Sequence, residues 1–229
     1  MTSGAPSSDG APDSSEPGQR RRSPGSRDRL LAAAMTAFCD TGYLATSVED
    51  IAAAAGVSRM TFYRHFHNRA DVAAELFQAA AAEARPRYLA IATADHIDRA
   101  VVMDWLRTLF AADRAGRRLL QVFSQATADP EGFTQRAQRV FADLIRELGR
   151  TIPAFAVDPD EPGQRRRWLE AWLLLYEILD QSNHAALDSG VAADPLVIEI
   201  LADRFLGFVL GPGALRPTRN PSSTKESRS

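Results

Sequence analysis

Residues 47–66 predict two short helices joined by a tight turn, and this pattern constrains the fold more than any other part of the sequence. They read SVEDIAAAAGVSRMTFYRHF. Ser47 and Asp50 have the spacing of a capping box, in which the serine oxygen accepts an amide and the carboxylate reaches back, so we expect a helix through Ala55. Glycine then permits a turn, and Ser58 caps a second short helix. Two helices joined in this way form a helix-turn-helix, whose second helix enters the major groove of DNA.

The rest of the sequence, apart from its two ends, predicts helices only. Apolar residues recur at helical spacing, glycine and proline are sparse, and no run alternates as a half-buried strand does. The predicted fold class is therefore all-α, with an N-terminal three-helix helix-turn-helix domain and a C-terminal helical bundle. The other predicted helices span about Arg27–Asp40, a stretch from a capping pattern at Asn68–Asp71 to a break near Pro86, Ile97–Ala112, Arg114–Ala128, Pro130–Arg150, Arg165–Asp188 and Asp194–Leu210.

Composition divides the chain into four predicted parts. Residues 1–26 and 213–229 contain too few large apolar side chains to offset the entropy of ordering, so we expect disordered tails, the first with a basic end. Residues 27–85 are expected to bind DNA, and residues 86–212 to form the helical ligand-binding and dimerisation domain. No apolar run is long enough for a membrane span or suited to a signal peptide, so we expect a cytoplasmic, nucleoid-associated protein.

Charge is distributed unevenly between these parts. Residues 19–70 hold eight arginines against four acids, a net charge of +4, whereas residues 71–212 hold 15 arginines against 21 acids, a net charge of −6. A basic head on an acidic body suits a protein that binds a polyanion at one end. Arg20, Arg21 and Arg22 could form an arm in the minor groove, or equally a solvated charge run.

The segment Thr41–Val72, TGYLATSVEDIAAAAGVSRMTFYRHFHNRADV, resembles the tetracycline-repressor (TetR) family of transcriptional regulators. The turn, the Thr-Phe-Tyr-Arg-His-Phe run and the capped next helix occur in the same order and spacing. The resemblance implies a homodimer whose last two long helices form a four-helix interface, and a fourth helix that moves when a ligand binds. Met60 departs from the family pattern, in which a small or polar residue is more usual.

The resemblance assigns DNA contacts residue by residue. Arg59, Met60 and Thr61 begin the recognition helix, where base edges are reached, and arginine suits guanine through paired hydrogen bonds. Tyr63 and His65 are expected to contact phosphates, although both could instead pack between helices, and Ser47 and Arg69 are expected to fix the register on the backbone. The complete predicted set is Ser47, Arg59, Met60, Thr61, Tyr63, Arg64, His65 and Arg69.

Large apolar residues of the C-terminal domain supply two further predictions. A ligand pocket among the bundle helices is predicted at Trp105, Leu109, Phe123, Phe141, Trp172 and Tyr176, although ordinary core packing explains each of these residues too. The helix from Arg165 to Asp188 is apolar on more than one side, and so is the last helix, which is expected of helices that face both a core and a partner subunit. The predicted dimer interface is Trp168, Leu175, Leu179, Leu201, Phe205 and Phe208.

These features predict a DNA-binding transcription regulator, a repressor that a small-molecule effector releases from a palindromic operator on double-stranded DNA. The alternative on the same fold is a nucleoid-binding architectural or division-control protein that needs no ligand. The four histidines form no zinc-binding motif, and the sequence has no Gly-rich phosphate loop or Gly-x-Ser-x-Gly elbow, so we expect no enzyme, no metal and no cofactor.

Overall fold

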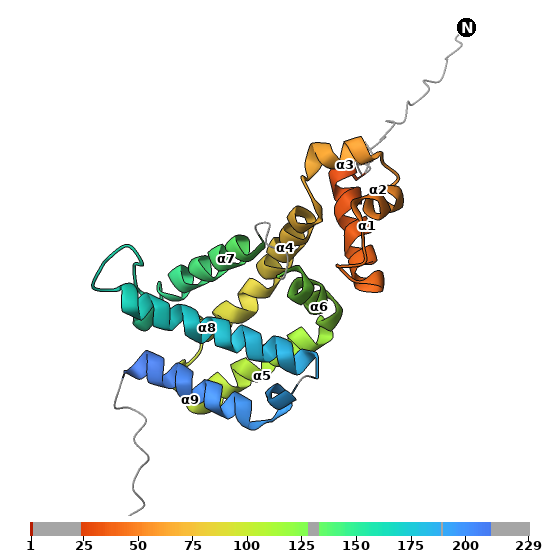
Figure 1. The fold of residues 1–229 in the computed structure, drawn as a ribbon. Coiled ribbons are helices and arrows are strands. Elements are labelled where there is room, and N and C mark those ends of the chain that lie inside the picture. The colour runs from red at the N-terminus through yellow and green to blue at the C-terminus, as the bar shows by residue number, and fades with distance from the viewer. Residues whose placement is uncertain (2–23, 128–132, 189, 212–229) are drawn as a thin grey trace, which may run out of the picture.

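The computed structural model describes residues 1, 24–127, 133–188 and 190–211, and all regular structure in these residues is helical, which confirms the all-α fold (Figure 1). Both predicted tails, including Arg20 to Arg22, lie outside the described residues except at their edges. None of the described helices is sufficiently long and apolar to span a membrane. The helices are α1 Ser26–Thr41, α2 Val48–Ala54, α3 Arg59–His65, α4 Arg69–Leu89, α5 Arg99–Ala115, α6 Arg117–Ala126, α7 Phe133–Leu148, α8 Arg165–Ala186 and α9 Leu196–Leu210, with short 3-10 helices η1 Ala90–Thr93, η2 Pro153–Phe155 and η3 Gly190–Ala193.

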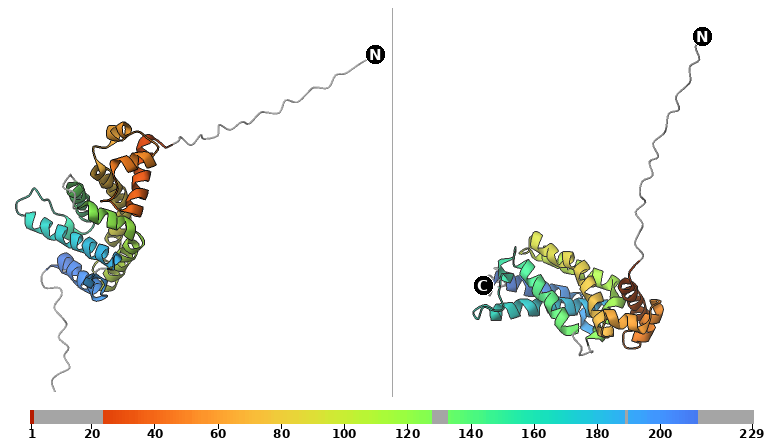
Figure 2. Two further views of the ribbon diagram at one scale, coloured as in Figure 1. Left: turned by 45° about the vertical axis from the view of Figure 1, so that its right-hand side comes forward. Right: turned by 90° about the horizontal axis from the view of Figure 1, so that it is seen from above.

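Helices α1 to α3 and the start of α4 form a small unit, here called the head, at one end of the molecule (Figure 2). Its core is built around four fully buried side chains, Leu30 and Phe38 of α1, Ile51 of α2 and Phe62 of α3. Helix α6 completes this core from outside the head, because Val122, Phe123 and Ala126 belong to the same cluster. The head is thus packed onto the rest of the chain.

The remaining helices, here called the body, form a second bundle. In Figure 1, α8 lies between α7 on one side and α5 and α9 on the other. The core of the body includes Leu106 of α5, Phe155 of η2, Leu175 of α8 and Phe205 of α9, all of which are fully or almost fully buried. Phe155 packs against Phe205 and Phe208, with ring centroids 6.1 and 4.8 Å apart.

Helix α4 continues through Pro86, near which the sequence predicted a break or kink, and ends at Leu89. Proline removes one backbone hydrogen bond from a helix, and tertiary contacts can outweigh that loss. Here the residues beyond it are held by the body, since Tyr88 is buried in the body core and the Trp105 indole donates a hydrogen bond to the carbonyl oxygen of Arg87 at 2.9 Å. The predicted domain boundary after residue 85 therefore falls inside a continuous helix.

Other helix ends differ from the predicted ones by a few residues, and their caps explain why. Helix α5 begins after Asp98 rather than at Ile97, because the Asp98 carboxylate accepts the amides of Ala100 and Val101 at 2.7 and 3.3 Å. Gly116 separates α5 from α6, so α5 extends to Ala115.

Gly149 follows α7 at a point where two backbone segments almost touch. A Cβ atom placed on it would lie 2.6 Å from the Phe155 carbonyl oxygen and 2.9 Å from the Phe155 carbonyl carbon. Both atoms are backbone and cannot rotate away. A side chain here would push η2, and with it Phe155, out of the core.

We therefore expect Gly149→Ala to lower the free energy of unfolding by about 1–3 kcal/mol, the usual cost of overpacking. Gly163→Ala is the matched control, because a Cβ atom there meets nothing within 4 Å. Urea unfolding followed by circular dichroism measures both variants. Equal midpoints for the two variants would show that the approach of η2 to Gly149 does not constrain the fold.

Candidate functional sites

The two helices of the helix-turn-helix begin at the capping residues that the sequence predicted. The Ser47 Oγ accepts the amide of Asp50 at 3.1 Å, and the Asp50 carboxylate accepts the amide and hydroxyl of Ser47 at 2.9 and 2.6 Å. The two hydrogen bonds from Ser47 lower the pKa of Asp50. Gly56 makes the turn at φ +64°, in the left-handed region that favours glycine, and the Ser58 Oγ accepts the amide of Thr61 at 3.1 Å. These bonds fix where α3 begins.

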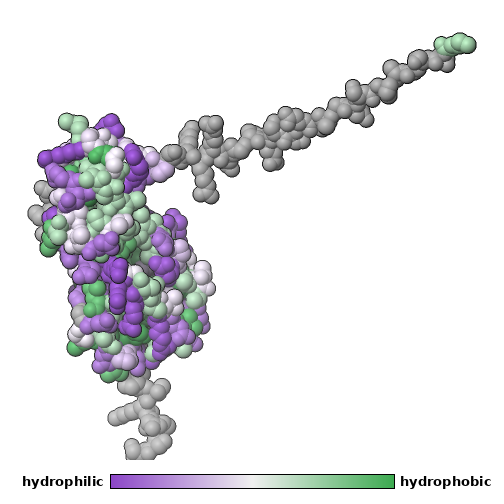
Figure 3. Space-filling view, turned by 90° about the vertical axis from the view of Figure 1, so that its right-hand side faces the viewer, coloured by the Kyte–Doolittle hydropathy of each residue, from purple (hydrophilic) through white to green (hydrophobic). Residues whose placement is uncertain are grey.

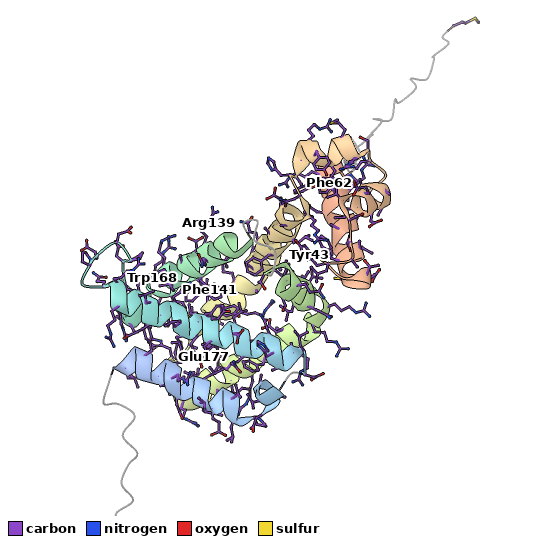
Figure 4. The ribbon with its side chains drawn as sticks, in the orientation of Figure 1. Tyr43, Phe62, Arg139, Phe141, Trp168 and Glu177 are labelled. Carbon is purple, nitrogen blue, oxygen red and sulfur yellow. The ribbon has the colours of Figure 1, made fainter. Side chains whose placement is uncertain are left out.

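One face of α3 is buried in the head and the opposite face is open. Phe62 is fully buried against Ile51 and other head residues (Figure 4). Met60 and Tyr63 are exposed over 79% and 43% of their surface, which is unusual for large hydrophobic residues. Arg59 and Arg64 are exposed on the same short helix, and Thr61 is half-buried with its hydroxyl 3.0 Å from Ser58 Oγ. The predicted base-reading residues thus lie near or on an open surface.

Arg59 of α3 contacts side chains from both helices of the motif. Its guanidinium lies 2.9 Å from the Glu49 carboxylate of α2, donates to the Tyr63 hydroxyl at 3.3 Å and lies 5.4 Å from the centre of the Tyr63 ring. The hydrogen bond with Tyr63, followed by the charge of Glu49, raises the pKa of Arg59. The side chain therefore remains a fully charged donor that is oriented but exposed.

His65 and Arg69 have intramolecular partners that the sequence did not predict. His65 Nε2 lies 2.8 Å from Ser26 Oγ at the start of α1, so a phosphate contact of His65 would compete with this bond. Arg69 donates from Nη1 to the carbonyl oxygens of Tyr43, Leu44 and Thr46 at 3.3, 3.0 and 3.2 Å. Its guanidinium also lies 4.7 Å from the centre of the Tyr43 ring. Arg69 thus supports the loop between α1 and α2, so its influence on DNA register would be largely indirect.

A cavity of about 810 Å³ is bounded by four helices: α4, the last turn of α5, the first turns of α6, and α7. This volume falls within the range usual for small-molecule sites. Phe123 and Phe141, both predicted for the pocket, line it; Figure 4 shows Phe141 on α7, on the side toward α8. Four of the ten α4 residues that line the cavity are alanines, whose small side chains leave space open.

The other four residues predicted for the pocket do not line the cavity, and packing explains why. Trp105 and Leu109 are buried in the body core, where the Trp105 ring contacts Phe205 at 5.3 Å between centroids. Trp172 and Tyr176 stack on each other with centroids 5.1 Å apart and planes 7° apart, beside Phe141. These four residues pack against other side chains of the body, whereas Phe123 and Phe141 line the cavity.

The predicted dimer interface also needs correction. Leu175, Leu201, Phe205 and Phe208 are at most 8% exposed within the single subunit, so their side chains are part of its own core. Trp168 and Leu179 are only partly buried, and they too pack against that core. The four buried residues therefore have little surface to offer a partner, whereas Trp168 and Leu179 keep part of theirs.

A different set of apolar side chains on α8 and α9 is open. They are Leu169, Leu173 and Tyr176 on α8, and Leu196, Ile200 and Leu210 on α9, each 42–59% exposed. Glu177 and Arg204 form an ion pair between the two helices, and Figure 4 shows Glu177 beside α9. Leu173 lies four residues before Glu177 on α8, and Ile200 lies four residues before Arg204 on α9. Residues at this spacing share one face of a helix, so Leu173 and Ile200 lie on the same side of the molecule as the ion pair. By contrast, the face in Figure 3 has only small hydrophobic patches among hydrophilic ones.

Helix α6 belongs to both the cavity and the head. Its first turns line the cavity, and Phe123 contacts Phe77 of α4 edge-to-face with ring centroids 5.2 Å apart. Gln125 Oε1 accepts the backbone amide of Tyr43 at 3.0 Å, in the loop that leads to α2. A change in the cavity wall therefore has a short physical path to the helix-turn-helix.

The sequence matches the family model described as "Bacterial regulatory proteins, tetR family" over residues 30–78, which spans α1 to the middle of α4. A search of curated proteins finds no match.

Solved structures with the same fold cover most of this chain. A protein from Streptomyces coelicolor A3(2) described as a transcriptional regulator has a TM-score of 0.57 and 21% identity, over 80% of this chain and 99% of that one. FadR of Thermus thermophilus, a TetR-family repressor solved with lauroyl-CoA, has a TM-score of 0.53 and 22% identity, over 83% and 98% of the two chains. SmeT, solved with triclosan, has a TM-score of 0.52 and 23% identity, over 88% and 99%. The chain therefore carries the N-terminal domain of the tetR family of bacterial regulatory proteins, on a fold that it shares with solved TetR-family transcriptional regulators.

Proposed function

We propose that this protein is a sequence-specific DNA-binding regulator, a repressor that leaves a palindromic operator when a small molecule binds in the body. The observation that carries the proposal is the open face of α3, where Arg59, Met60 and Tyr63 project from a helix whose start is fixed by side-chain caps. Exposed aromatic and apolar residues beside a charged arginine suit the base edges of a major groove, including the thymine methyl group.

The contacts of Arg59 suggest how it reads a base. Glu49 and Tyr63 hold the guanidinium in one orientation before DNA arrives, which reduces the entropy lost on binding. Arginine donates two parallel hydrogen bonds to the O6 and N7 atoms of guanine. We assign a guanine contact to Arg59 and a phosphate contact to Tyr63.

A homodimer through α8 and α9 is the second element of the proposal. One helix-turn-helix makes too few contacts for a useful specificity ratio, and a two-fold dimer doubles them on half-sites about 34 Å apart or a multiple of that. The exposed apolar residues of α8 and α9, which include Leu173 and Ile200, form the proposed dimer interface. Dimerisation through them leaves the cavity, which is bounded mainly by α4 to α7, within each subunit.

The cavity is the reason to prefer a ligand-responsive repressor over an architectural protein, which would need no such space. Two proteins with this fold were solved with small molecules, lauroyl-CoA and triclosan. We propose that a ligand between α4, α6 and α7 shifts α6, and that Phe123 and Gln125 pass the shift to the head.

Arg59→Ala and Tyr63→Phe should change DNA binding in different ways. Loss of a paired base contact should cost about 1–3 kcal/mol and relax the preference at one position of each half-site. Loss of the Tyr63 phosphate contact should weaken all sequences about equally, and because Tyr63→Phe also removes a hydrogen bond to Arg59, any loss of base preference should be smaller than that of Arg59→Ala. Binding-site selection from random DNA measures both variants against the wild type. If Arg59→Ala selects the wild-type motif unchanged, Arg59 does not read a base.

Leu173→Glu combined with Ile200→Glu should convert the dimer into folded monomers. Both side chains are more than half exposed in the single subunit, so the monomer tolerates the added charges. In the dimer interface each unpaired carboxylate would lose its hydration, which disfavours the dimer. Sedimentation velocity measures the change. Leu44→Glu is the control, because Leu44 is 62% exposed in the head, away from α8 and α9. A double variant that stays dimeric would place the interface elsewhere.

A further inference from the structure

The cavity wall has both apolar and polar parts. Phe77, Phe123 and Phe141 supply aromatic surface, and alanines of α4 and α5 together with aliphatic residues of α6, α7 and α8 supply the other apolar surface. The same cavity is lined by Tyr88 and Asp113, two polar residues on neighbouring helices. An occupant of this space would therefore have a mainly apolar body and one polar group.

The Tyr88 hydroxyl has no hydrogen-bond partner among the described residues. Tyr88 is only 8% exposed, and its Oη atom is buried. Burial raises the pKa of Tyr88, and the nearby Asp113 carboxylate raises it further, so the phenol stays uncharged. Since a buried polar group without a partner costs free energy, the hydroxyl of a residue that lines a cavity would gain from a hydrogen bond with a ligand.

Asp113 is a half-buried carboxylate with no cation in direct contact. It accepts one hydrogen bond, from the buried Ser182 hydroxyl at 2.5 Å, and no Arg, Lys or His among the described residues lies within 4 Å of it. Burial raises the pKa of Asp113, while Ser182 and the more distant Arg87 lower it. The negative charge is thus desolvated and incompletely neutralised.

The other charged residues of the cavity wall are mostly paired with one another. Arg85 and Arg150 both contact Glu147, and Arg146 contacts Asp143 at 2.6 Å. Because these arginines already have carboxylate partners, they favour an added anion less than isolated arginines would. Arg87 also lines the cavity and has no carboxylate partner among the described residues. It acts on Asp113 through its charge and not through a direct contact, so the contact position at the carboxylate stays open to a ligand. Asp113 is the carboxylate of the wall whose charge acts on the unsatisfied Tyr88 hydroxyl.

We propose that the cavity selects an amphiphilic amine, an apolar molecule whose protonated amino group lies between the Asp113 carboxylate and the Tyr88 hydroxyl oxygen. An ammonium carries three donors, so one group can satisfy both oxygens, and the aromatic rings of the wall add a favourable contact with a cation. The inference rests on the proposed function only in taking this cavity as the ligand site.

Three probes with the same ten-carbon chain and different head groups test the proposal: decylamine, 1-decanol and decanoate. Calorimetric titration of the full-length protein below the aggregation concentration of each probe should show decylamine binding about tenfold more tightly than 1-decanol, because charge-assisted hydrogen bonds are the stronger ones. Decanoate should bind more weakly than either. Equal affinities, a preference for decanoate, or no binding of decylamine would overturn the proposal.

Variants then locate the head group. Asp113→Asn should remove the preference for decylamine over 1-decanol, and Tyr88→Phe should weaken decylamine binding while leaving the folded protein intact. Asp143→Asn is the matched control, since Asp143 also lines the cavity but is paired with Arg146, and it should change decylamine affinity by no more than about twofold. A preference that survives Asp113→Asn would contradict the assignment.

DNA release is measured separately, with an operator obtained by binding-site selection. If decylamine binds with the predicted preference but leaves operator affinity unchanged, the amine site stands and ligand-controlled release fails. If the protein binds its operator but prefers decanoate or none of the probes, the amine proposal fails and DNA recognition stands.

Discussion

The contact between Phe77 and Phe123 joins the two halves of this molecule, and the proposed regulation depends on it. Phe77 lies on α4, which leads from the head into the body, and Phe123 lies on α6, which closes the head core. Both rings also line the cavity. Packed interiors transmit displacements because they contain little free volume, so a ligand that touches either ring acts on the head directly.

The head itself is rigid for local reasons. Ser47, Ser58 and Asn68 each cap a helix by accepting an amide three residues later, so α2, α3 and α4 start at fixed positions. Arg69 ties the loop before α2 to the start of α4. A movement of α4 or α6 would therefore carry α3 along as a unit. For a dimer on two half-sites, a small rotation of each head is enough to change the distance between recognition helices.

Sequence reasoning succeeded where the determinants are contiguous. The caps and the Gly56 turn are local signals, and the structure confirms the helices that they predict. The cavity was predictable only in part. Phe123 and Phe141 line it as expected, but the alanines among residues 80–84 look like ordinary helix formers until α7 is placed opposite them. The sequence could not separate exposed from buried residues of α9 because that helix is apolar nearly all round, so only the fold distinguishes buried Leu201 from open Ile200.

A symmetric dimer of this kind should recognise a small number of specific DNA sites. Genome-wide mapping of DNA bound by the tagged protein in its native cell measures this number. We expect one or a few sites that share a palindrome, with half-sites about one helical turn apart or a multiple of it. Hundreds of sites without a common palindrome would contradict this expectation and indicate an architectural protein on the same fold.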